Sequence, residues 1–328
     1  MVKVWARIRE AIESHASAGL ISVVSCAGSV PRENGARIVL RPDGGFYGTI
    51  GGGRLEYEAI AAGRAAIAAG RGKALFRDWP LGPNLGQCCG GMVKTLTETF
   101  DAKDLTAARF FEDAEKSGAF ITESRLGKDG RIARTIAPPR AGAGSLAAAV
   151  FDPKLFMERF GEVATPLLLF GAGHVGRAVI LTLATLPFDV RWIDSRPNQF
   201  PQHVPPNVVT VCTDAVADEL AQAPRDAMVV IMTHSHALDL DITVAALQHK
   251  TFDFVGLIGS ETKRARFVTV AQQLGLSDSV IERLICPIGI PEIKGKEPAV
   301  IAAALAAQLL IVREAVSVRQ ASPATQPA

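Results

Sequence analysis

The feature that most constrains the fold is a glycine-rich turn between an apolar run and a helical segment. Gly171-Ala172-Gly173-His174-Val175-Gly176 follows the apolar residues Leu167–Phe170, and Asp194 stands about twenty positions further on, at the end of the next apolar run. In a βαβ unit the first glycine allows a tight turn, the second lets the backbone approach a phosphate, and the third lets helix and strand pack closely. The pattern predicts a Rossmann-like unit in which phosphate rests on the helix N-terminus and Asp194 lies near a ribose.

The rest of the second half predicts a parallel sheet. Short apolar runs recur at Val190–Ile193, Val208–Val211, Met228–Met232 and Phe254–Ile258, separated by segments with helical character. Strands of near-continuous apolar character are typical of a doubly wound sheet that is covered on both faces. We expect an α/β Rossmann-like domain over residues 151–316, followed by a polar, disordered tail over 317–328.

The first half mixes helical segments with short strands, which predicts a separate α+β domain over residues 1–150. Helices are expected near 4–18, 54–69 and 104–117, with strands near 20–26, 36–41, 46–50, 73–79 and 92–100 and a hairpin through Lys128-Asp129-Gly130. Trp5, Ile8 and Ile12 share one face of the first helix. The Pro/Gly/Ala-rich stretch Ala137–Gly144 has little periodicity and is typical of a linker, so the boundary lies between about 138 and 164.

Two adjacent cysteines stand inside a glycine-bracketed segment of the first half, Gly86-Gln87-Cys88-Cys89-Gly90-Gly91. Glycine permits backbone conformations that other residues resist, so such a loop could present both thiols to a large ligand. Thiolates suit soft metals and sulfur chemistry. The alternatives are two small buried apolar side chains, or a strained vicinal disulfide.

A second glycine-rich turn, Gly51-Gly52-Gly53-Arg54, also leads from a strand into a helix. It could hold an anion at the helix N-terminus, and Arg32 on a nearby loop could add positive charge. An ordinary tight turn with surface charges is the alternative for both.

Polar clusters follow two more strands of the second half. If the strand at 228–232 continues, His234 and His236 point to one face and, with Asp239, could hold a divalent metal or a phosphate. Loop histidines, with Asp239 capping the next helix, are the alternative.

The other cluster is Gly259-Ser260 with Lys263 and Arg264. Ser260 can cap a helix and Lys263 can neutralise a phosphate, although a solvated basic helix face explains the same residues. Because the carboxyl ends of parallel strands meet at one edge, we expect both clusters to converge on the Gly171 turn.

Composition narrows the functional classes. The 328 residues carry a net charge of only +2, which does not favour a nucleic-acid or anionic-membrane surface. An odd number of cysteines, five, and an N-terminus without an apolar h-region indicate a reducing cytoplasm. The longest apolar run, Ala299–Val312, is short for a bilayer and contains Gln308, so a buried helix is expected. Signatures of a nucleophile elbow, a Walker A lysine or an HExxH pair are missing from the sequence.

Taken together, these residues resemble the XdhC/CoxI family of xanthine dehydrogenase accessory proteins. The resemblance rests on the following segments: Gly28–Arg32, Gly48–Glu56, Gly86–Gly91, Phe170–Gly176, Asp194–Pro197, Thr233–His236, Gly256–Ser260 and Pro287–Ile290. Two departures are mild, since the family usually has threonine or serine where Val30 stands and an acid near Ser235.

The resemblance implies a chaperone that binds molybdenum cofactor (Mo-molybdopterin) as cargo and protects it. Such a protein supports replacement of an oxo by a sulfido ligand with a cysteine desulfurase, and delivers the cofactor to the molybdenum subunit of apo xanthine dehydrogenase. It also implies a homodimer, without turnover of a metabolite.

On this reading Cys88 or Cys89 contacts molybdenum or relays sulfur, and the sheet edge near Gly171 holds the phosphate end. The further cofactor-binding residues are then Arg32, Gly51, Gly52, Gly53, Arg54, Gly171, Gly173, His174, Gly176, Asp194, Arg196, His234, His236, Gly259, Ser260 and Lys263. A nucleotide at the Rossmann loop, in an NAD(P)-dependent oxidoreductase, is the alternative, and a scaffold that binds only proteins is a third reading.

Overall fold

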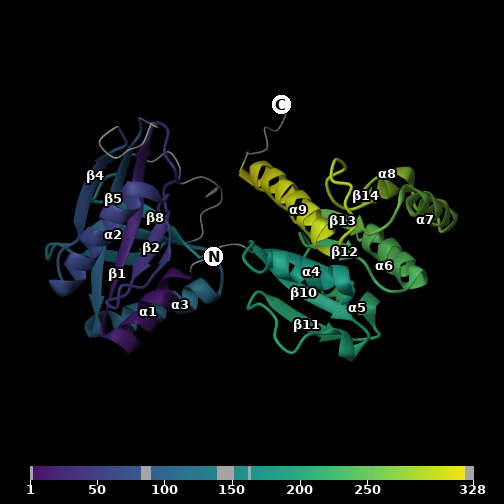
Figure 1. The fold of residues 1–328 in the computed structure, drawn as a ribbon, viewed down its shortest axis with the longest axis horizontal. Coiled ribbons are helices and arrows are strands. Elements are labelled where there is room, and N and C mark those ends of the chain that lie inside the picture. Colours follow the sequence, from purple (N-terminus) through teal and green to yellow (C-terminus); the bar gives the residue numbers. More distant parts are fainter. Residues whose placement is uncertain (1–2, 83–89, 139–150, 162–163, 250, 322–328) are drawn as a thin grey trace. The chain divides into compact units, whose positions relative to one another are not determined.

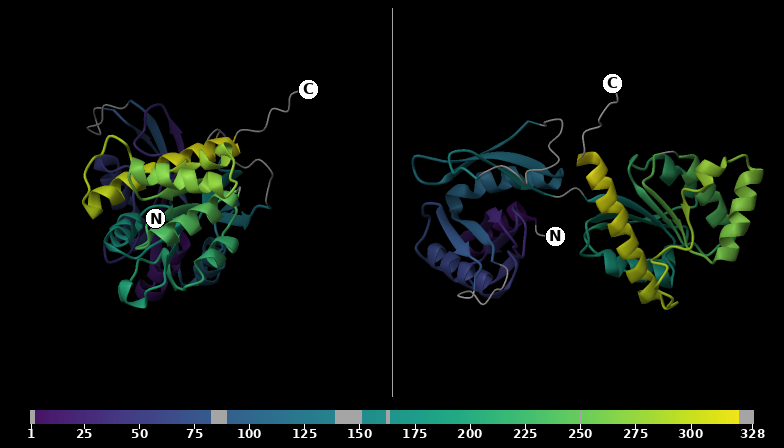
Figure 2. Two further views of the ribbon diagram at one scale, coloured as in Figure 1. Left: turned by 90° about the vertical axis from the view of Figure 1, so that its right-hand side faces the viewer. Right: turned by 90° about the horizontal axis from the view of Figure 1, so that it is seen from above.

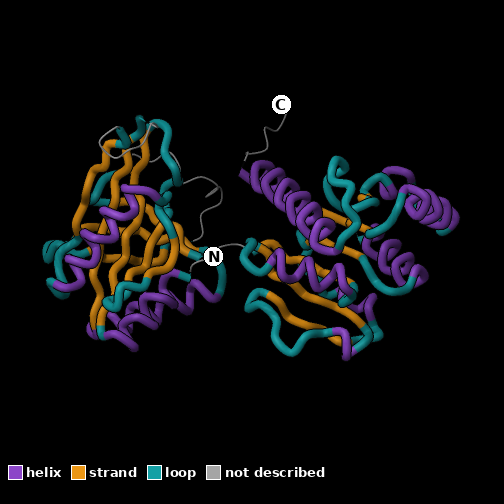
Figure 3. Tube along the Cα trace, viewed as in Figure 1, coloured by secondary structure: helices purple, strands orange, loops and turns teal. Residues whose placement is uncertain are grey.

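The chain folds into two compact units, residues 1–163 and 164–328 (Figure 1). The computed structural model describes residues 3–82, 90–138, 151–161, 164–249 and 251–321. Each unit has helices packed on its own strands, as Figure 3 shows by colour.

Unit 1 is built on a five-stranded antiparallel sheet with the order β3-β2-β1-β5-β4. Its elements are α1 (Val4–His15), β1 (Ser17–Ala27), β2 (Arg37–Leu40), β3 (Phe46–Gly48), α2 (Gly53–Ala68), β4 (Leu75–Pro80), β5 (Met92–Asp101) and α3 (Leu105–Lys116). Side chains alternate across β1, so Leu20 packs with Trp5 of α1 while Ile21 packs with Leu55 of α2. Both faces are therefore buried, and the amphipathic face predicted for α1 is confirmed.

A smaller three-stranded sheet, β7-β6-β8, completes unit 1. It contains β6 (Phe120–Leu126), β7 (Ile132–Ile136) and β8 (Phe156–Phe160). The hairpin between β6 and β7 was expected, but β8 was not. Because β8 pairs with β6, residues 156–160 pack in unit 1, whereas the sequence suggested a second domain from residue 151.

Buried charges join the two sheets of unit 1. The guanidinium of Arg134 on β7 donates to both carboxylate oxygens of Glu98 on β5, at 2.8 and 2.6 Å, and to Glu158 on β8 at 2.7 Å. Burial alone would raise the pKa of Glu158, but the charges of Arg134 and Arg37 outweigh it and lower that pKa. The network fixes the two sheets against each other.

Unit 2 is a six-stranded, wholly parallel sheet with the order β11-β10-β9-β12-β13-β14. Its elements are β9 (Thr165–Phe170), α4 (His174–Leu183), β10 (Phe188–Asp194), β11 (Val208–Cys212), α5 (Val216–Ala221), β12 (Met228–Ile231), α6 (His236–Gln248), β13 (Phe254–Leu257), α7 (Glu261–Gln273), α8 (Asp278–Ile281), β14 (Leu284–Ile285) and α9 (Pro298–Ala321). The helices α4 and α9 cover one face of the sheet and α5 and α6 cover the other, as Figure 2 shows for α9 (yellow) and the green helices. This is the predicted α/β architecture, with the short strand β14 added.

The C-terminal helix α9 is longer than the apolar run that suggested it. Among the described residues it is the one helix that could cross a membrane by length and composition, since Pro298–Val316 has a mean hydropathy of 1.9. Its face carrying Leu305 and Leu309 is nevertheless buried in the core beside α4. Gln308 also exchanges two hydrogen bonds with the backbone of Gly289, at 2.8 and 3.1 Å. These contacts are those of a core helix.

Candidate functional site

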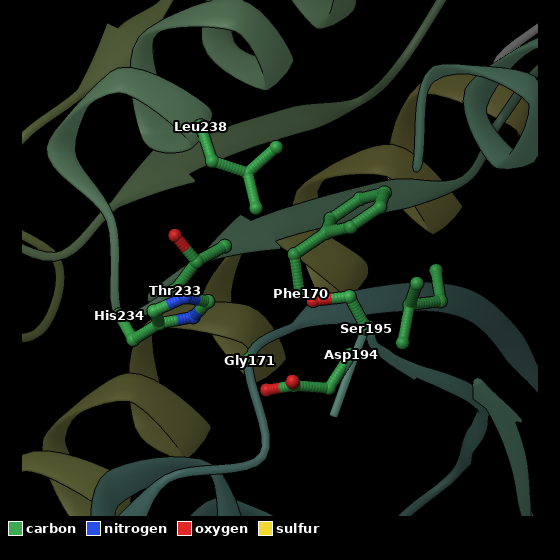
Figure 4. A pocket seen from close by; sticks show the side chains of 8 residues that line it. Phe170, Gly171, Asp194, Ser195, Thr233, His234 and Leu238 are labelled. Carbon is green, nitrogen blue, oxygen red and sulfur yellow. The ribbon is translucent and has the colours of Figure 1, made fainter. Parts of the chain in front are cut away.

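The strand order of unit 2 reverses between β9 and β12, and a hollow opens there at the carboxyl ends of the strands. This switch point is where open α/β sheets bind ligands. Its lining residues are Phe170, Gly171, Ile193, Asp194, Ser195, Thr233, His234 and Leu238. Figure 4 shows Thr233 and His234 on one side of the hollow, Asp194 and Ser195 on the other, and Gly171 between them. The predicted convergence of the Gly171 turn with the His234 cluster is therefore present.

The three glycines of the turn meet different constraints. Gly171 has φ +114, and a Cβ there would overlap the carbonyl oxygen of Met232. A Cβ on Gly176 would overlap the carbonyl oxygen of Gly171. Gly173, by contrast, has an ordinary φ of −73 and nothing within 4 Å of the place a Cβ would take. Packing thus explains Gly171 and Gly176, whereas the open space at Gly173 suits the close approach of a ligand.

Asp194 is 6% exposed and its carboxylate accepts four hydrogen bonds. The Ala172 N–H, in the glycine turn, is 2.7 Å from Oδ2; Arg196 donates from its N–H and Nε to Oδ1 and from Nη2 to Oδ2, at 2.9, 3.0 and 3.0 Å. Burial alone would raise the pKa of Asp194, but the bonds from Arg196 and Ala172 lower it. Asp194 therefore holds the turn and Arg196 in place, a function that differs from the predicted ribose contact.

The prediction that His234 and His236 share a strand face is wrong. β12 ends at Ile231 and His236 is the first residue of α6, because Ser235 caps that helix by accepting from the Leu238 N–H at 3.4 Å. Asp239 is therefore not the cap. Within the described ranges, no group of three or more His, Cys, Asp or Glu side chains is placed to hold a metal ion.

Asp239, 1% exposed, instead ties two strand ends together. Its Oδ1 accepts from the Thr233 N–H and hydroxyl at 2.9 and 2.7 Å, and its Oδ2 accepts from Lys263 Nζ at 2.7 Å. Lys263 also donates to the carbonyl of Ile258 at 2.9 Å. The predicted cap at Ser260 is present, since its hydroxyl accepts from the Lys263 N–H at 3.2 Å. Lys263 thus forms an ion pair with Asp239, whereas the sequence suggested that Lys263 contacts a phosphate.

Two cysteines near this edge of unit 2 were not predicted as site residues from the sequence. Cys212 ends β11 beside Asp194, is exposed, and lies with its Sγ 3.6 Å from the carbonyl oxygen of Ser195. Cys286 is buried next to Gly259, and burial raises the pKa of its thiol to about 11. The signal for Cys212 was its place directly after the apolar run Val208–Val211, at the same edge as Asp194.

In unit 1 the glycine turn before α2 already encloses an anion, the carboxylate of Glu56. Its Oε2 accepts from the Thr49 hydroxyl at 2.6 Å and from the N–H groups of Ile50 and Gly52 at 2.9 and 3.2 Å. Burial would raise the pKa of Glu56, but these bonds lower it. A phosphate in this turn would have to displace Glu56, so the turn as folded is a rigid support for its neighbours.

Three glycine-bearing segments meet beside that turn. A Cβ on Gly51 (φ +124) would lie 2.5 Å from Pro31 Cγ and 3.4 Å from Arg32 Cγ. A Cβ on Gly28 would lie 3.2 Å from Gly91 Cα. The loop that contains Gly28 and Pro31 therefore lies so close to Gly51 and Gly91 that a Cβ at either of these two glycines would overlap it. Arg32 is exposed at this meeting point, whereas Arg54 points to Glu58, with Nε 2.8 Å from Oε1.

Cys88 and Cys89 lie outside the described residues, but both flanks of their segment are fixed. Leu81 donates from its N–H to the Gly91 carbonyl at 2.8 Å, and the Gly90 N–H donates to the Leu81 carbonyl at 2.9 Å. Ser29 forms a bridge with Gly90. Gly90, which follows the cysteine pair in the sequence, therefore lies directly beside Ser29. Cys26, half-buried nearby, has its Sγ 3.5 Å from the Arg32 carbonyl, and burial raises the pKa of its thiol.

Comparisons with known proteins agree with this architecture. The model of the XdhC Rossmann domain matches residues 167–309, and the model of the XdhC and CoxI family matches residues 11–77, so together they span more than half of the chain. A crystal structure of a xanthine dehydrogenase from Bacillus halodurans is 21% identical with a TM-score of 0.75, covering 99% of this chain and 98% of that one. At 21% identity this match shows a shared fold and nothing about function.

Two Escherichia coli proteins are similar over most of the chain. The uncharacterized protein YqeB is 24% identical over 92% of this chain, which spans only 44% of YqeB's length. The molybdenum cofactor insertion chaperone PaoD is 23% identical, over 86% of this chain and 79% of PaoD. The two family models, matched in the two units that carry the glycine turns, show that this chain belongs to the XdhC and CoxI family.

Proposed function

We propose that this chain binds molybdenum cofactor as cargo and passes it to an apo-oxidoreductase of the xanthine dehydrogenase type. The observation that carries the proposal is the meeting of three segments in unit 1. Ser29 bridges Gly90, and Gly51 lies against Pro31, so that Gly90, which follows Cys88 and Cys89 in the sequence, lies beside the loop that carries Arg32. This chain is similar in sequence to PaoD, a molybdenum cofactor insertion chaperone, along most of PaoD's length.

The chemistry of the cargo suits these residues. Molybdopterin offers a phosphate and a soft, dithiolene-bound metal, and thiolates are ligands that such a metal accepts. Cys88 and Cys89 would meet the molybdenum, while Arg32, exposed on the neighbouring loop, would balance negative charge. Glu56 keeps the turn that supports Arg32 in shape, through the bonds to Thr49 and the turn amides.

The wider cellular role follows from the same proposal. The chain acts as a carrier in the cytoplasm, without turnover of a metabolite. It supports replacement of an oxo by a sulfido ligand with sulfur from a cysteine desulfurase, and it acts as a homodimer that meets the molybdenum subunit of the apo-enzyme.

The test is reconstitution with purified components. The chain is isolated without oxygen from cells that make the cofactor, and its molybdenum and pterin contents are measured. It is then mixed with apo xanthine dehydrogenase, and activity is followed against free cofactor as the control. We expect molybdenum and pterin to co-purify and the loaded chain to activate the apo-enzyme faster than free cofactor does. A chain that holds neither molybdenum nor pterin, when prepared in this way, contradicts the proposal.

A further inference from the structure

We propose that the carboxyl edge of unit 2 binds a ligand through a phosphate monoester, which Arg196 reads, and rejects the free ribose diol that an NAD site accepts. Asp194 is in this view the positioning residue for Arg196. The proposal concerns unit 2 and does not depend on which cargo unit 1 carries.

The argument begins with the acceptor capacity of Asp194. An ionised carboxylate has about four lone-pair sites. Four hydrogen bonds from Ala172 and Arg196 use them, two on each oxygen. In a site for NAD, the acid at the end of the second strand must be free to accept from ribose hydroxyls. Asp194 has no acceptor left for them, and opening one would cost an ion pair that is mostly buried.

The second step concerns the donors that remain. Arg196 uses its N–H, Nε and Nη2 on Asp194, and Nη1 has no partner among the described residues. Its side chain is 35% exposed, so the free end faces solvent at the sheet edge. An arginine in this position is the residue that accommodates a terminal phosphate in place of a hydroxyl. Because Asp194 fixes the guanidinium, little side-chain entropy is lost when a phosphate binds.

The third step is the turn itself. α4 begins at His174 without a side-chain cap, so its first N–H groups are not satisfied by a side chain. Gly173, just before it, leaves open space where a Cβ would stand. The first N–H groups of α4 and the Nη1 group of Arg196 are therefore donors that an anion at this edge would satisfy.

A matched pair of probes tests the proposal. NADP⁺ and NAD⁺ differ only in one phosphate monoester, and binding of each to the metal-free full chain is measured by calorimetry. We expect NADP⁺ to bind about tenfold more tightly or better, as expected for one charge-assisted contact. Inorganic phosphate as a competitor shows whether the phosphate group alone is enough. Equal affinity for the two probes, or binding of neither at millimolar concentration, overturns the proposal.

Variants separate recognition from folding. Arg196→Gln should bring the ratio of the two affinities close to one, and Asp194→Asn should lower it in part, since the guanidinium is then free to move. Arg191→Gln removes a charge from β10, the strand that ends at Asp194, where Arg191 pairs with Glu219, and should leave the ratio unchanged. Gly173→Ala has room and an ordinary φ, so the fold should persist while both probes bind more weakly. A ratio that survives in Arg196→Gln contradicts the assignment. Because no molybdenum is used, this failure is distinct from a failure of cofactor carriage.

Discussion

The guanidinium of Arg196 lies against the carboxylate of Asp194, with Nε 3.0 Å from Oδ1 and Nη2 3.0 Å from Oδ2. The same carboxylate accepts from the Ala172 N–H at 2.7 Å, so one side chain ties the end of β10 to the turn after β9. A residue that the sequence suggests as a ligand contact thus belongs to the framework of the site.

Asp194→Asn should destabilise unit 2 at neutral pH and not in acid. The pKa of Asp194 is lowered in the folded chain, so its contribution is present above the unfolded value of about 3.9 and is lost as the pH falls through the folded pKa. We expect a loss of about 1–3 kcal/mol at pH 7. Urea unfolding at pH 7 and in acid measures the change, with the exposed Asp189→Asn as control. An equal loss at both pH values would contradict the charged role.

Glu56→Gln should loosen the glycine turn of unit 1. The substitution keeps the shape of the side chain but removes the charge that strengthens the bonds from Thr49, Ile50 and Gly52, and we expect a cost of about 1–3 kcal/mol. The neighbouring Glu58→Gln breaks only a surface pair with Arg54 and should cost less than about 1 kcal/mol. Thermal unfolding compares the two variants, and equal melting temperatures would speak against the support that we assign to Glu56.

Gly51→Ala should be more damaging than Gly52→Ala. Both residues have positive φ values, +124 and +75, which an alanine adopts only with strain of about 1–2 kcal/mol. The added Cβ meets Pro31 at 2.5 Å in the first case and nothing within 4 Å in the second. Gly51→Ala must therefore also push the Pro31 loop away, and with it Arg32. Denaturant midpoints for the pair measure the difference, and a milder effect at Gly51 would show that the two loops do not meet as described.

Arg134→Met should destabilise unit 1 strongly. It leaves the carboxylates of Glu98 and Glu158 buried without their main partner, which typically costs about 3–5 kcal/mol. The control is Arg109→Met, which removes an exposed partner of Glu13 and should change the stability by less than about 1 kcal/mol. If the free energy of unfolding of Arg134→Met matches that of the control, the buried network does not join the two sheets.

The apolar runs of the second half predicted the sheet of unit 2 because a strand that is buried on both faces consists almost entirely of apolar residues. The strands β8 and β14 were missed for the opposite reason. Phe156–Phe160 does not alternate apolar and polar residues and follows a linker-like stretch, and Leu284–Ile285 is too short for a pattern. What positions them is pairing with β6 and β13, which no local signal carries.

The site was predictable in place but not in detail. Glycine turns and the strand-end rule located the edge at Gly171 and Thr233. The partners of Asp194, Glu56 and Asp239 were not predictable, because a carboxylate near a turn can bind a ligand or the chain itself, and only the folded geometry decides. His236 was misplaced because Ser235 starts a helix where a continued strand was assumed.

The most direct measurement of the central claim is cofactor retention by the Cys88→Ala/Cys89→Ala variant. Wild type, this variant and Cys212→Ala, which removes an exposed thiol of unit 2, are isolated alike, and their molybdenum and pterin contents are determined. The account predicts that the double variant loses molybdenum and fails to activate apo xanthine dehydrogenase, while Cys212→Ala behaves like wild type. A double variant that retains cofactor and delivers it as well as wild type would contradict the account.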